Sequence, residues 1–295
     1  MNLKKIITEN NRVTYQFDYS DKLREYFNPK EEFFIEYDGI DISNIPDSIL
    51  VIPFLCNVLP IAWLMDDTIY VQEIDKEYYE SIPEFKEGYI NMYPQFNFGG
   101  KVVADKIVNN SRNTETVQNL AFFSGGVDAF NTLVNHINEK PVLITLWGSD
   151  VFFDDIEGWH NVKNHVVKTA ELFSLEYKFI KSNFRKFINE STLSKMVLER
   201  GSYYGWWGGF HHGIGLIGHS APLAYIYNSK TVYIASSFSV KDSEKFAWAS
   251  DPTIDNFVRL GGRGNTHVIH DGYEFSRQDK IRNICDFFQK HSDVK

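Results

Sequence analysis

Cysteine is scarce in this sequence. Its 295 residues include only Cys56 and Cys285, which lie far apart along the chain. Two distant cysteines make neither a disulfide framework nor a C-x-x-C metal site. The first twenty residues, MNLKKIITENNRVTYQFDYS, also contain no apolar segment of signal-peptide length. We therefore expect a cytoplasmic protein.

Long hydrophobic runs are missing as well. The stretch ILVIPFLCNVLPIAWLM comes closest to the roughly 18 apolar residues of a membrane span, but Pro53, Asn57 and Pro60 interrupt it. We expect no membrane segment. Its first part, ILVIPFL, reads as a buried strand that ends at one of the two prolines.

Basic residues are in the minority, with 30 Lys and Arg against 39 Asp and Glu, for a formal charge of −9. This balance argues against a broad nucleic-acid or anionic-membrane surface. Aromatic residues, in contrast, are abundant: 24 Phe, 16 Tyr and 6 Trp. They indicate either an aromatic-rich core or an aromatic-lined ligand pocket.

Two units are expected along the chain. Residues 1–112 predict a smaller α+β domain, with strands in EEFFIEYDG, TIYVQEID and GGKVVADKIV and a helix in KEYYESIPEF broken at Pro83. NNSRNTETVQ, residues 109–118, is either a linker or a capped helix. In residues 113–295, the strands LAFF, PVLITLW, EYKFIKSN and TVYIASSF alternate with helices. That alternation predicts an α/β domain with a parallel sheet and helices on both faces.

The stretch NLAFFSGGVDAFNTLVNHI carries the most informative motif. An apolar strand, Leu120 to Phe123, ends in Ser-Gly-Gly-Val-Asp, and Phe130, Leu133, Val134 and Ile137 then recur at helical spacing. A strand, a glycine turn and a helix N-terminus leave free backbone N–H groups that bind anions, most often phosphate. The alternative is an ordinary turn capped by Asp128.

Other glycine patterns fit less well. GIGLIG, residues 213–218, matches a dinucleotide fingerprint in letters, but no strand precedes it and no acidic residue follows at the right distance. It is better explained as a helix with small residues. GHSAP has Pro222 where a nucleophile elbow needs glycine. The SGGVD loop also lacks the lysine of a Walker P-loop.

FFSGGVDAF resembles the S-G-G-x-D-S signature of the PP-loop ATP pyrophosphatases, the adenine nucleotide alpha hydrolase-like group that includes 7-cyano-7-deazaguanine synthase. The resemblance covers about residues 115–290 and implies a Rossmann-like PP-loop domain that binds ATP and Mg²⁺. It implies that the loop wraps the pyrophosphate, with Asp128 also holding the metal. The loop residues are Ser124, Gly125, Gly126, Val127 and Asp128. The last serine of the signature is Ala129 here.

The same resemblance implies that ITLWGSD carries the adenine site, with Trp147 stacking on the base, Gly148 beside it and Asp150 serving the ribose or a metal. A plain strand end is the alternative. In the C-terminal helix, Arg277 and Lys280 are expected to stabilise the leaving pyrophosphate, unless they belong to a solvated face. His211, His212 and His219 lack a third partner at zinc-ligand spacing. They are either polar residues of a substrate pocket or core or surface histidines.

The sequence thus predicts an ATP-dependent ligase or amidotransferase-type ATP pyrophosphatase with Asp128, Arg277 and Lys280 in the reaction. It would adenylate a carbonyl or carboxylate acceptor, releasing AMP and pyrophosphate, for amide, nitrile or thio-group formation. The expected partners are a small-molecule acceptor and either a second copy or an ammonia- or sulfur-donor protein. The alternative is a module that senses a nucleotide without catalysis inside a larger biosynthetic or defence system, and Ala129 favours it.

Overall fold

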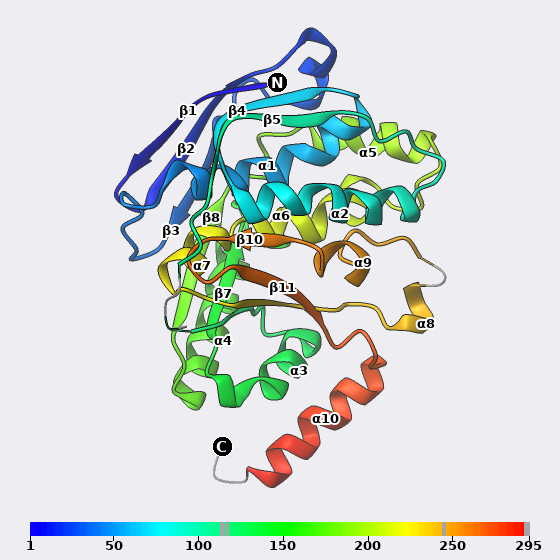
Figure 1. The fold of residues 1–295 in the computed structure, drawn as a ribbon. Coiled ribbons are helices and arrows are strands. Elements are labelled where there is room, and N and C mark those ends of the chain that lie inside the picture. Colours follow the sequence, from blue (N-terminus) through cyan, green and yellow to red (C-terminus); the bar gives the residue numbers. More distant parts are fainter. Residues whose placement is uncertain (113–114, 116–117, 244–245, 292–295) are drawn as a thin grey trace.

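The computed structural model describes residues 1–112, 115, 118–243 and 246–291. The chain is an α/β protein built on one large, mostly parallel sheet with helices packed against it (Figure 1). The strands are β1 (Asn2–Glu9), β2 (Arg12–Asp18), β3 (Phe33–Tyr37), β4 (Thr68–Asp75), β5 (Lys101–Val108), β6 (Leu120–Phe122), β7 (Val142–Trp147), β8 (Tyr177–Ser182), β9 (Thr231–Ala235), β10 (Arg259–Gly261) and β11 (Thr266–Asp271).

The helices pack on this sheet or on one another. They are α1 (Asp47–Leu64), α2 (Lys76–Met92), α3 (Val127–Asn135), α4 (Ile156–Phe173), α5 (Glu190–Glu199), α6 (His212–Gly218), α7 (Ala221–Ile226), α8 (Val240–Ser243), α9 (Pro252–Asp255) and α10 (Arg277–Lys290). Two 3₁₀ turns, Asp21–Tyr26 and Ile137–Glu139, and a π-helical segment, Trp207–His211, complete the described elements.

The sheet has the order β10-β11-β9-β6-β7-β8-β3-β2-β1-β4-β5. Within it, β8, β7, β6, β9 and β11 are mutually parallel. The strands predicted in EEFFIEYDG, TIYVQEID, GGKVVADKIV, LAFF, PVLITLW, EYKFIKSN and TVYIASSF are all confirmed.

Both faces of the parallel part are covered. Adjacent residues of a strand belong to different clusters of buried side chains: Val142 and Ile144 of β7 join a large core that contains α1, whereas Leu143 packs with residues of α3 and α4. Side chains that alternate between two apolar layers explain why these strands are continuously apolar in sequence. The prediction of helices on both faces of the sheet is confirmed for this part.

The prediction of a strand at ILVIPFL was wrong, because these residues lie inside α1. Every residue of α1 after Asp47 is buried, so its hydrophobicity has no periodicity that distinguishes a helix from a strand. Pro53 and Pro60 each cost about 3 kcal/mol inside a helix. Burial of many Leu, Ile, Val and Phe side chains, at about 1.5–3 kcal/mol each, outweighs that cost.

Helix α1 is also long and apolar enough to cross a membrane, and no other helix of the described ranges is. It is 94% buried inside the protein, as the core helix of a soluble protein would be. Helix α2 likewise continues through Pro83, where a break was predicted. Residues 109–112, 115 and 118 are not helical; residues 113, 114, 116 and 117, also part of the predicted linker or helix, lie outside the described residues.

The sheet continues across residue 112. β3 pairs antiparallel with β8, with Ile35 opposite Ser182, and the large core includes side chains from both sides of this position. The division into domains 1–112 and 113–295 stays a prediction.

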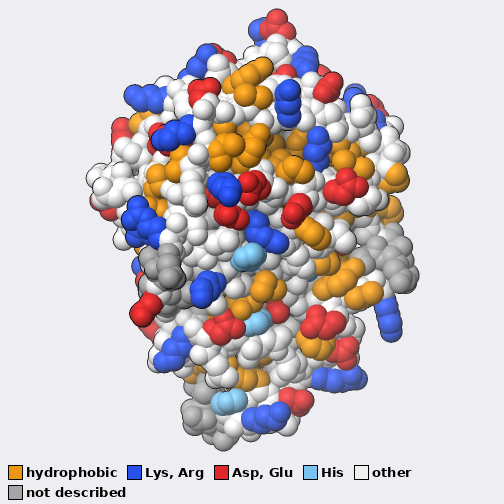
Figure 2. All heavy atoms as spheres, viewed as in Figure 1, with side chains coloured by type: hydrophobic (Ala, Val, Ile, Leu, Met, Phe, Trp, Pro, Cys, Tyr) orange, Lys and Arg blue, Asp and Glu red, His pale blue; other side chains and the backbone are white. Residues whose placement is uncertain are grey.

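On the face drawn in Figure 2, acidic and basic side chains are interspersed. Hydrophobic side chains gather in its upper half, over α2, β4 and β5. Exposed Tyr70, Ile90 and Ile107 belong to these elements.

Candidate functional site

The connection order of the parallel strands creates a crevice beside β6. The chain runs from β6 outward to β7 and β8, then returns to the other side of β6 to form β9 and β11. The connections that leave β6 and β9 at their carboxyl ends therefore diverge. Open α/β sheets bind ligands at such a point, outside the carboxyl ends of the strands.

The SGGVD loop lies at this point, between β6 and α3. Gly125 has φ +82°, and a Cβ there would lie 2.1 Å from Cδ2 of His165, so the position requires glycine. Gly126 is the N-cap of α3 and provides no side-chain cap. The first N–H groups of α3 are thus left without a side-chain acceptor at the positive end of the helix dipole.

One interpretation of the sequence was that Asp128 caps this helix, but Asp128 does not cap it. It lies in the first turn of α3, and its two oxygens bind two cations of α10: Oδ2 lies 2.8 Å from an Arg277 nitrogen and Oδ1 lies 3.1 Å from Lys280 Nζ. The Lys280 side chain is only 1% exposed and also donates to the Ser236 carbonyl, whereas Arg277 is 61% exposed. The structure therefore brings the predicted cations to the predicted loop.

Helix α10 is held in this place by further contacts with α3. Asn283 donates to the side-chain oxygens of Asn131 and Asn135 at 2.9 and 2.7 Å, and the rings of Phe288 and Phe130 lie near each other. The helix begins at a capping box between Ser276 and Asp279, as the sequence predicted. This start places Arg277 in the first turn, facing Asp128.

A hollow of about 190 Å³ opens next to the loop. Its wall combines apolar side chains with hydroxyl, carboxylate and imidazole groups from the carboxyl ends of β6, β7 and β9 and from α6. The lining residues are Phe122, Phe123, Ser124, Gly126, Asp128, Ala129, Ile144, Thr145, Leu146, Ser149, Asp150, His212, Leu216, Ile234, Ala235 and Ser237. We call this space the loop hollow.

Asp150 and His212 are polar residues that line the loop hollow and lie outside the SGGVD loop. Trp207 Nε1 donates to Asp150 at 3.2 Å, and the Trp207 ring lies 4.9 Å from the ring of His212. Burial lowers the pKa of His212 to about 4, although the Asp150 charge opposes this effect. His212 is therefore neutral at physiological pH.

The other two histidines of the cluster lie in the core. His211 contacts Asn57 Oδ1 at 2.7 Å, and His219 contacts Ser182 Oγ at 2.9 Å and the Gly215 carbonyl at 2.6 Å. Burial lowers the pKa of both, and the pKa of His219 is about 4. Of the three histidines, only His212 faces the loop hollow.

Trp147 and Gly148, which were predicted to hold the adenine, are not in the loop hollow. Trp147 stacks on Trp159 with ring centroids 5.2 Å apart, and it lines a separate cavity together with Lys163 and Lys181. Its side chain lies on the α4 face of the sheet, because the last residue of β7 points opposite to Leu146. Val127 begins α3 and does not line the loop hollow either.

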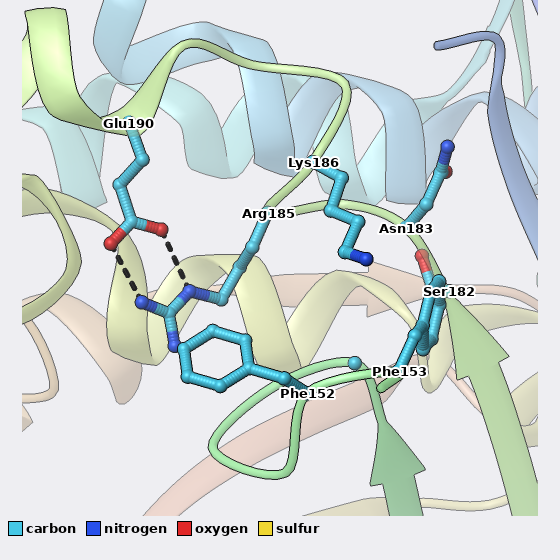
Figure 3. Close-up of a pocket in the computed structure, with 8 residues that line it drawn as sticks. Phe152, Phe153, Ser182, Asn183, Arg185, Lys186 and Glu190 are labelled. Atoms are coloured by element: carbon cyan, nitrogen blue, oxygen red, sulfur yellow. Dashed lines mark hydrogen bonds and ion pairs between the residues drawn. The ribbon is translucent and has the colours of Figure 1, made fainter. Parts of the chain in front are cut away.

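A second cavity, of about 250 Å³, lies beside the loop hollow at the ends of β7 and β8 (Figure 3). It is lined by Gly148, Phe152, Phe153 and residues that follow β8. Figure 3 shows Arg185 with its guanidinium turned to Glu190 and the Phe152 ring beside it. Arg185 makes two bonds to Glu190, at 2.6 and 2.7 Å, and one to the Ser149 carbonyl at 2.9 Å. Arg185 thereby fixes the loop that separates the two spaces.

Several lining residues were not singled out from the sequence. Thr145 donates to the Phe123 carbonyl at 2.6 Å, and Ser149 donates to the Leu146 carbonyl at 2.9 Å, so both shape the ends of β6 and β7. Leu216 and Ser237 reach the loop hollow from α6 and from the end of β9. The position of these residues at the ends of predicted strands could have indicated that they line a binding site. The sequence, however, does not say which strands are neighbours in the sheet.

Metal ligands are few in this region. Within the described residues, no group of three or more His, Cys, Asp and Glu side chains is placed to hold a metal ion. Asp128, the predicted ligand, already has a cation at each oxygen.

The chain matches no protein-family model, and no curated protein or solved structure is significantly similar to it.

Proposed function

We propose that this chain is an ATP-binding protein of the PP-loop, Rossmann-like type that adenylates a carbonyl or carboxylate acceptor. One observation carries the proposal: a glycine loop with an uncapped helix N-terminus lies at the strand-order switch point, and two cations of a distant helix converge on it. Backbone N–H groups, a helix dipole and positive side chains together favour a polyphosphate.

The residues present suit ATP with a magnesium ion carried mainly by phosphate oxygens. Magnesium is commonly held by one or two carboxylates plus substrate phosphates. Asp150 lines the loop hollow and is the better candidate for this role, because Asp128 is paired with Lys280 and Arg277. When bound, the ion would neutralise phosphate charge.

The protein residues would act by positioning and by charge. The α3 N-terminus and Ser124 would orient the phosphates, and Lys280 and Arg277 would stabilise the charge that develops on the leaving pyrophosphate. Apolar side chains such as Ile144 and Ile234 would exclude water from the reacting groups. The acceptor would enter from the open side of the loop hollow.

The reaction products test this proposal. We expect AMP and pyrophosphate in the presence of an acceptor, because no Walker lysine is available for γ-phosphoryl transfer. Nucleotide chromatography of the reaction with ATP, Mg²⁺ and candidate carboxylic acids measures this directly. ADP and free phosphate as the only products, in a preparation free of other ATPases, would rule out the pyrophosphatase chemistry.

A second function, nucleotide binding without catalysis inside a larger assembly, is favoured by one residue. Ala129 lines the loop hollow where the resembled signature has a serine hydroxyl. Loss of that hydroxyl removes one hydrogen bond to phosphate, which is worth more in a transition state than in a ground state. ATP that binds in calorimetry and stays intact with every acceptor would support this function over the first.

A further inference from the structure

The cavity at the ends of β7 and β8 is shaped by a glycine and two phenylalanine rings. Gly148 has φ +104°, and a Cβ there would overlap the Ser182 carbonyl oxygen and lie 2.8 Å from Cε1 of Phe153, so the position requires glycine. The Phe153 ring packs against Trp147, with ring centroids 5.4 Å apart, whereas Phe152 is 50% exposed at the cavity. One aromatic wall is therefore held by the fold, and the other is open to solvent.

Most polar groups that line the cavity are paired inside the protein. Ser182 and Asn183 both bond the backbone of β3: Ser182 Oγ donates to the Phe34 carbonyl at 3.0 Å, and Asn183 Oδ1 accepts from the Phe34 N–H at 2.9 Å. The carboxylate of Glu190 accepts two bonds from Arg185, at 2.6 and 2.7 Å. These groups shape the cavity and together contribute no net charge to it.

Lys186 differs from these groups. Its ammonium lies over the Phe153 ring, 5.2 Å from the ring centroid, and Figure 3 shows its side chain pointing to the side of the cavity where Ser182 and Phe153 lie. Among the residues that the structure describes, no carboxylate forms an ion pair with Lys186. The cavity is thus lined by two cations, Lys186 and Arg185, and one anion, Glu190, which leaves one net positive charge beside aromatic rings.

We propose that this cavity binds a small aromatic carboxylate, with its ring against Phe152 and Phe153 and its carboxylate on Lys186. Aromatic side chains favour a planar apolar partner in offset or edge contact, and a lysine ammonium pairs with a carboxylate as a compact point charge. The proposal goes beyond ATP binding and does not depend on it.

The size and charge of the cavity restrict the ligand. Its volume of about 250 Å³ is below the roughly 300–1,000 Å³ of pockets that enclose drug-sized ligands, so the ligand should be no larger than about one ring with a short acidic chain. A polyphosphate carries more negative charge than one ammonium balances. It is better matched by the helix N-terminus at the SGGVD loop.

Fluorine NMR titration without nucleotide tests the site, with 4-fluorophenylacetate as the probe and 4-fluorophenylacetamide as its uncharged counterpart. We expect the wild-type protein to bind the acid about fivefold more tightly than the amide, because an ion pair to an exposed lysine contributes up to about that factor. In Lys186→Met, the acid should bind only as well as the amide, whereas Lys186→Arg should keep the preference. Phe152→Ala should weaken both compounds by about threefold or more, since they share the ring.

Lys168→Met is the matched control, because Lys168 is exposed on α4 and does not line the cavity. It should bind both compounds as the wild type does. Equal affinities of the wild type for acid and amide, or no binding of either at millimolar concentration, would overturn the carboxylate site. The same preference in wild type and Lys186→Met would place the charge recognition elsewhere and overturn it too. None of these results bears on ATP binding, since the titrations contain no nucleotide.

Discussion

Gly125 and Gly126 are adjacent but have different structural requirements. Gly125 has a positive φ and lies against His165, so any side chain there would distort the loop. Gly126 has φ −74°, and the nearest atom to a Cβ would be Ser124 Oγ at 3.6 Å. A substitution at Gly126 therefore changes the chemistry of the helix N-terminus without strain in the backbone.

Gly126→Asp should abolish ATP binding while the protein stays folded. The introduced carboxylate would lie at the N-cap of α3, where it repels phosphate but stabilises the helix, relative to glycine, by a few tenths of a kcal/mol as a cap. We expect no heat of ATP binding in calorimetry and an unchanged or higher melting temperature. Gly126→Ala, which adds volume without charge, is the control and should bind ATP. Wild-type affinity in Gly126→Asp would mean that the nucleotide binds elsewhere.

At the scale of elements, helix α10, near the end of the described chain, contacts the loop that follows β6 through Asp128. Lys280 is buried and bonds both Asp128 and the Ser236 carbonyl, so its removal would leave one Asp128 oxygen and that carbonyl without a donor and destabilise the protein. Arg277 is 61% exposed, and its surface ion pair contributes at most about 1 kcal/mol to folding. Arg277 thus allows a test of nucleotide binding that is separate from stability.

Arg277→Ala should weaken ATP binding or turnover by about tenfold, with little change in melting temperature, because a charge-assisted bond to phosphate is worth more than an exposed ion pair. Arg282→Ala is the control. Arg282 is on the same helix and pairs with Asp279 at 3.2 Å, at 68% exposure. Equal nucleotide titrations for the two variants would reduce α10 to a scaffold.

At the scale of the whole molecule, stability should depend on pH through a cluster between α3 and the sheet. His136 contacts Glu139 at 2.9 Å and Asp271 at 3.0 Å. Burial acts to lower the pKa of His136, but its bonds to Asp271 and Glu139 outweigh burial and raise it. Burial acts to raise the pKa of Glu139 and Asp271, but their bonds to His136 and other donors lower both.

The directions of these pKa shifts define the pH range in which the cluster stabilises the folded protein. Stabilisation by charged His136 is complete below its unfolded pKa of about 6.5 and is lost as pH rises through the raised folded value; stabilisation by the carboxylates is present above about 4 to 4.5 and is lost in acid. His136→Gln should therefore lower the free energy of unfolding by roughly 1 kcal/mol more at pH 5.5 than at pH 8.5. Urea unfolding at the two pH values measures the difference. A cost independent of pH would show that His136 is not charged in the folded protein.

The sequence by itself determined the local structure around the loop and its chemistry. Apolar strand, glycine turn and amphipathic helix were readable at residues 120–137, and so was the capping box at Ser276, because these signals depend on near neighbours in the chain. The alternation of strands and helices after residue 120 likewise predicted a parallel sheet covered on both faces. Arg277 and Lys280 were expected at the loop, and the structure pairs both with Asp128.

Only the tertiary structure decided which residues share the loop hollow. Whether residues 49–55 form a strand or part of a helix depended on what surrounds them. A segment that is buried on all sides is apolar at every position, so its sequence has no periodicity that separates a helix from a strand. The same holds for Trp147, whose side of the sheet follows from its place in β7, and for His212, which lines the loop hollow while the adjacent His211 lies in the core. The order β8-β7-β6-β9 makes the ends of β6, β7 and β9 neighbours, and Asp150 and His212 line the loop hollow together with residues of the SGGVD loop, because long-range strand pairing, not spacing along the chain, sets which segments meet.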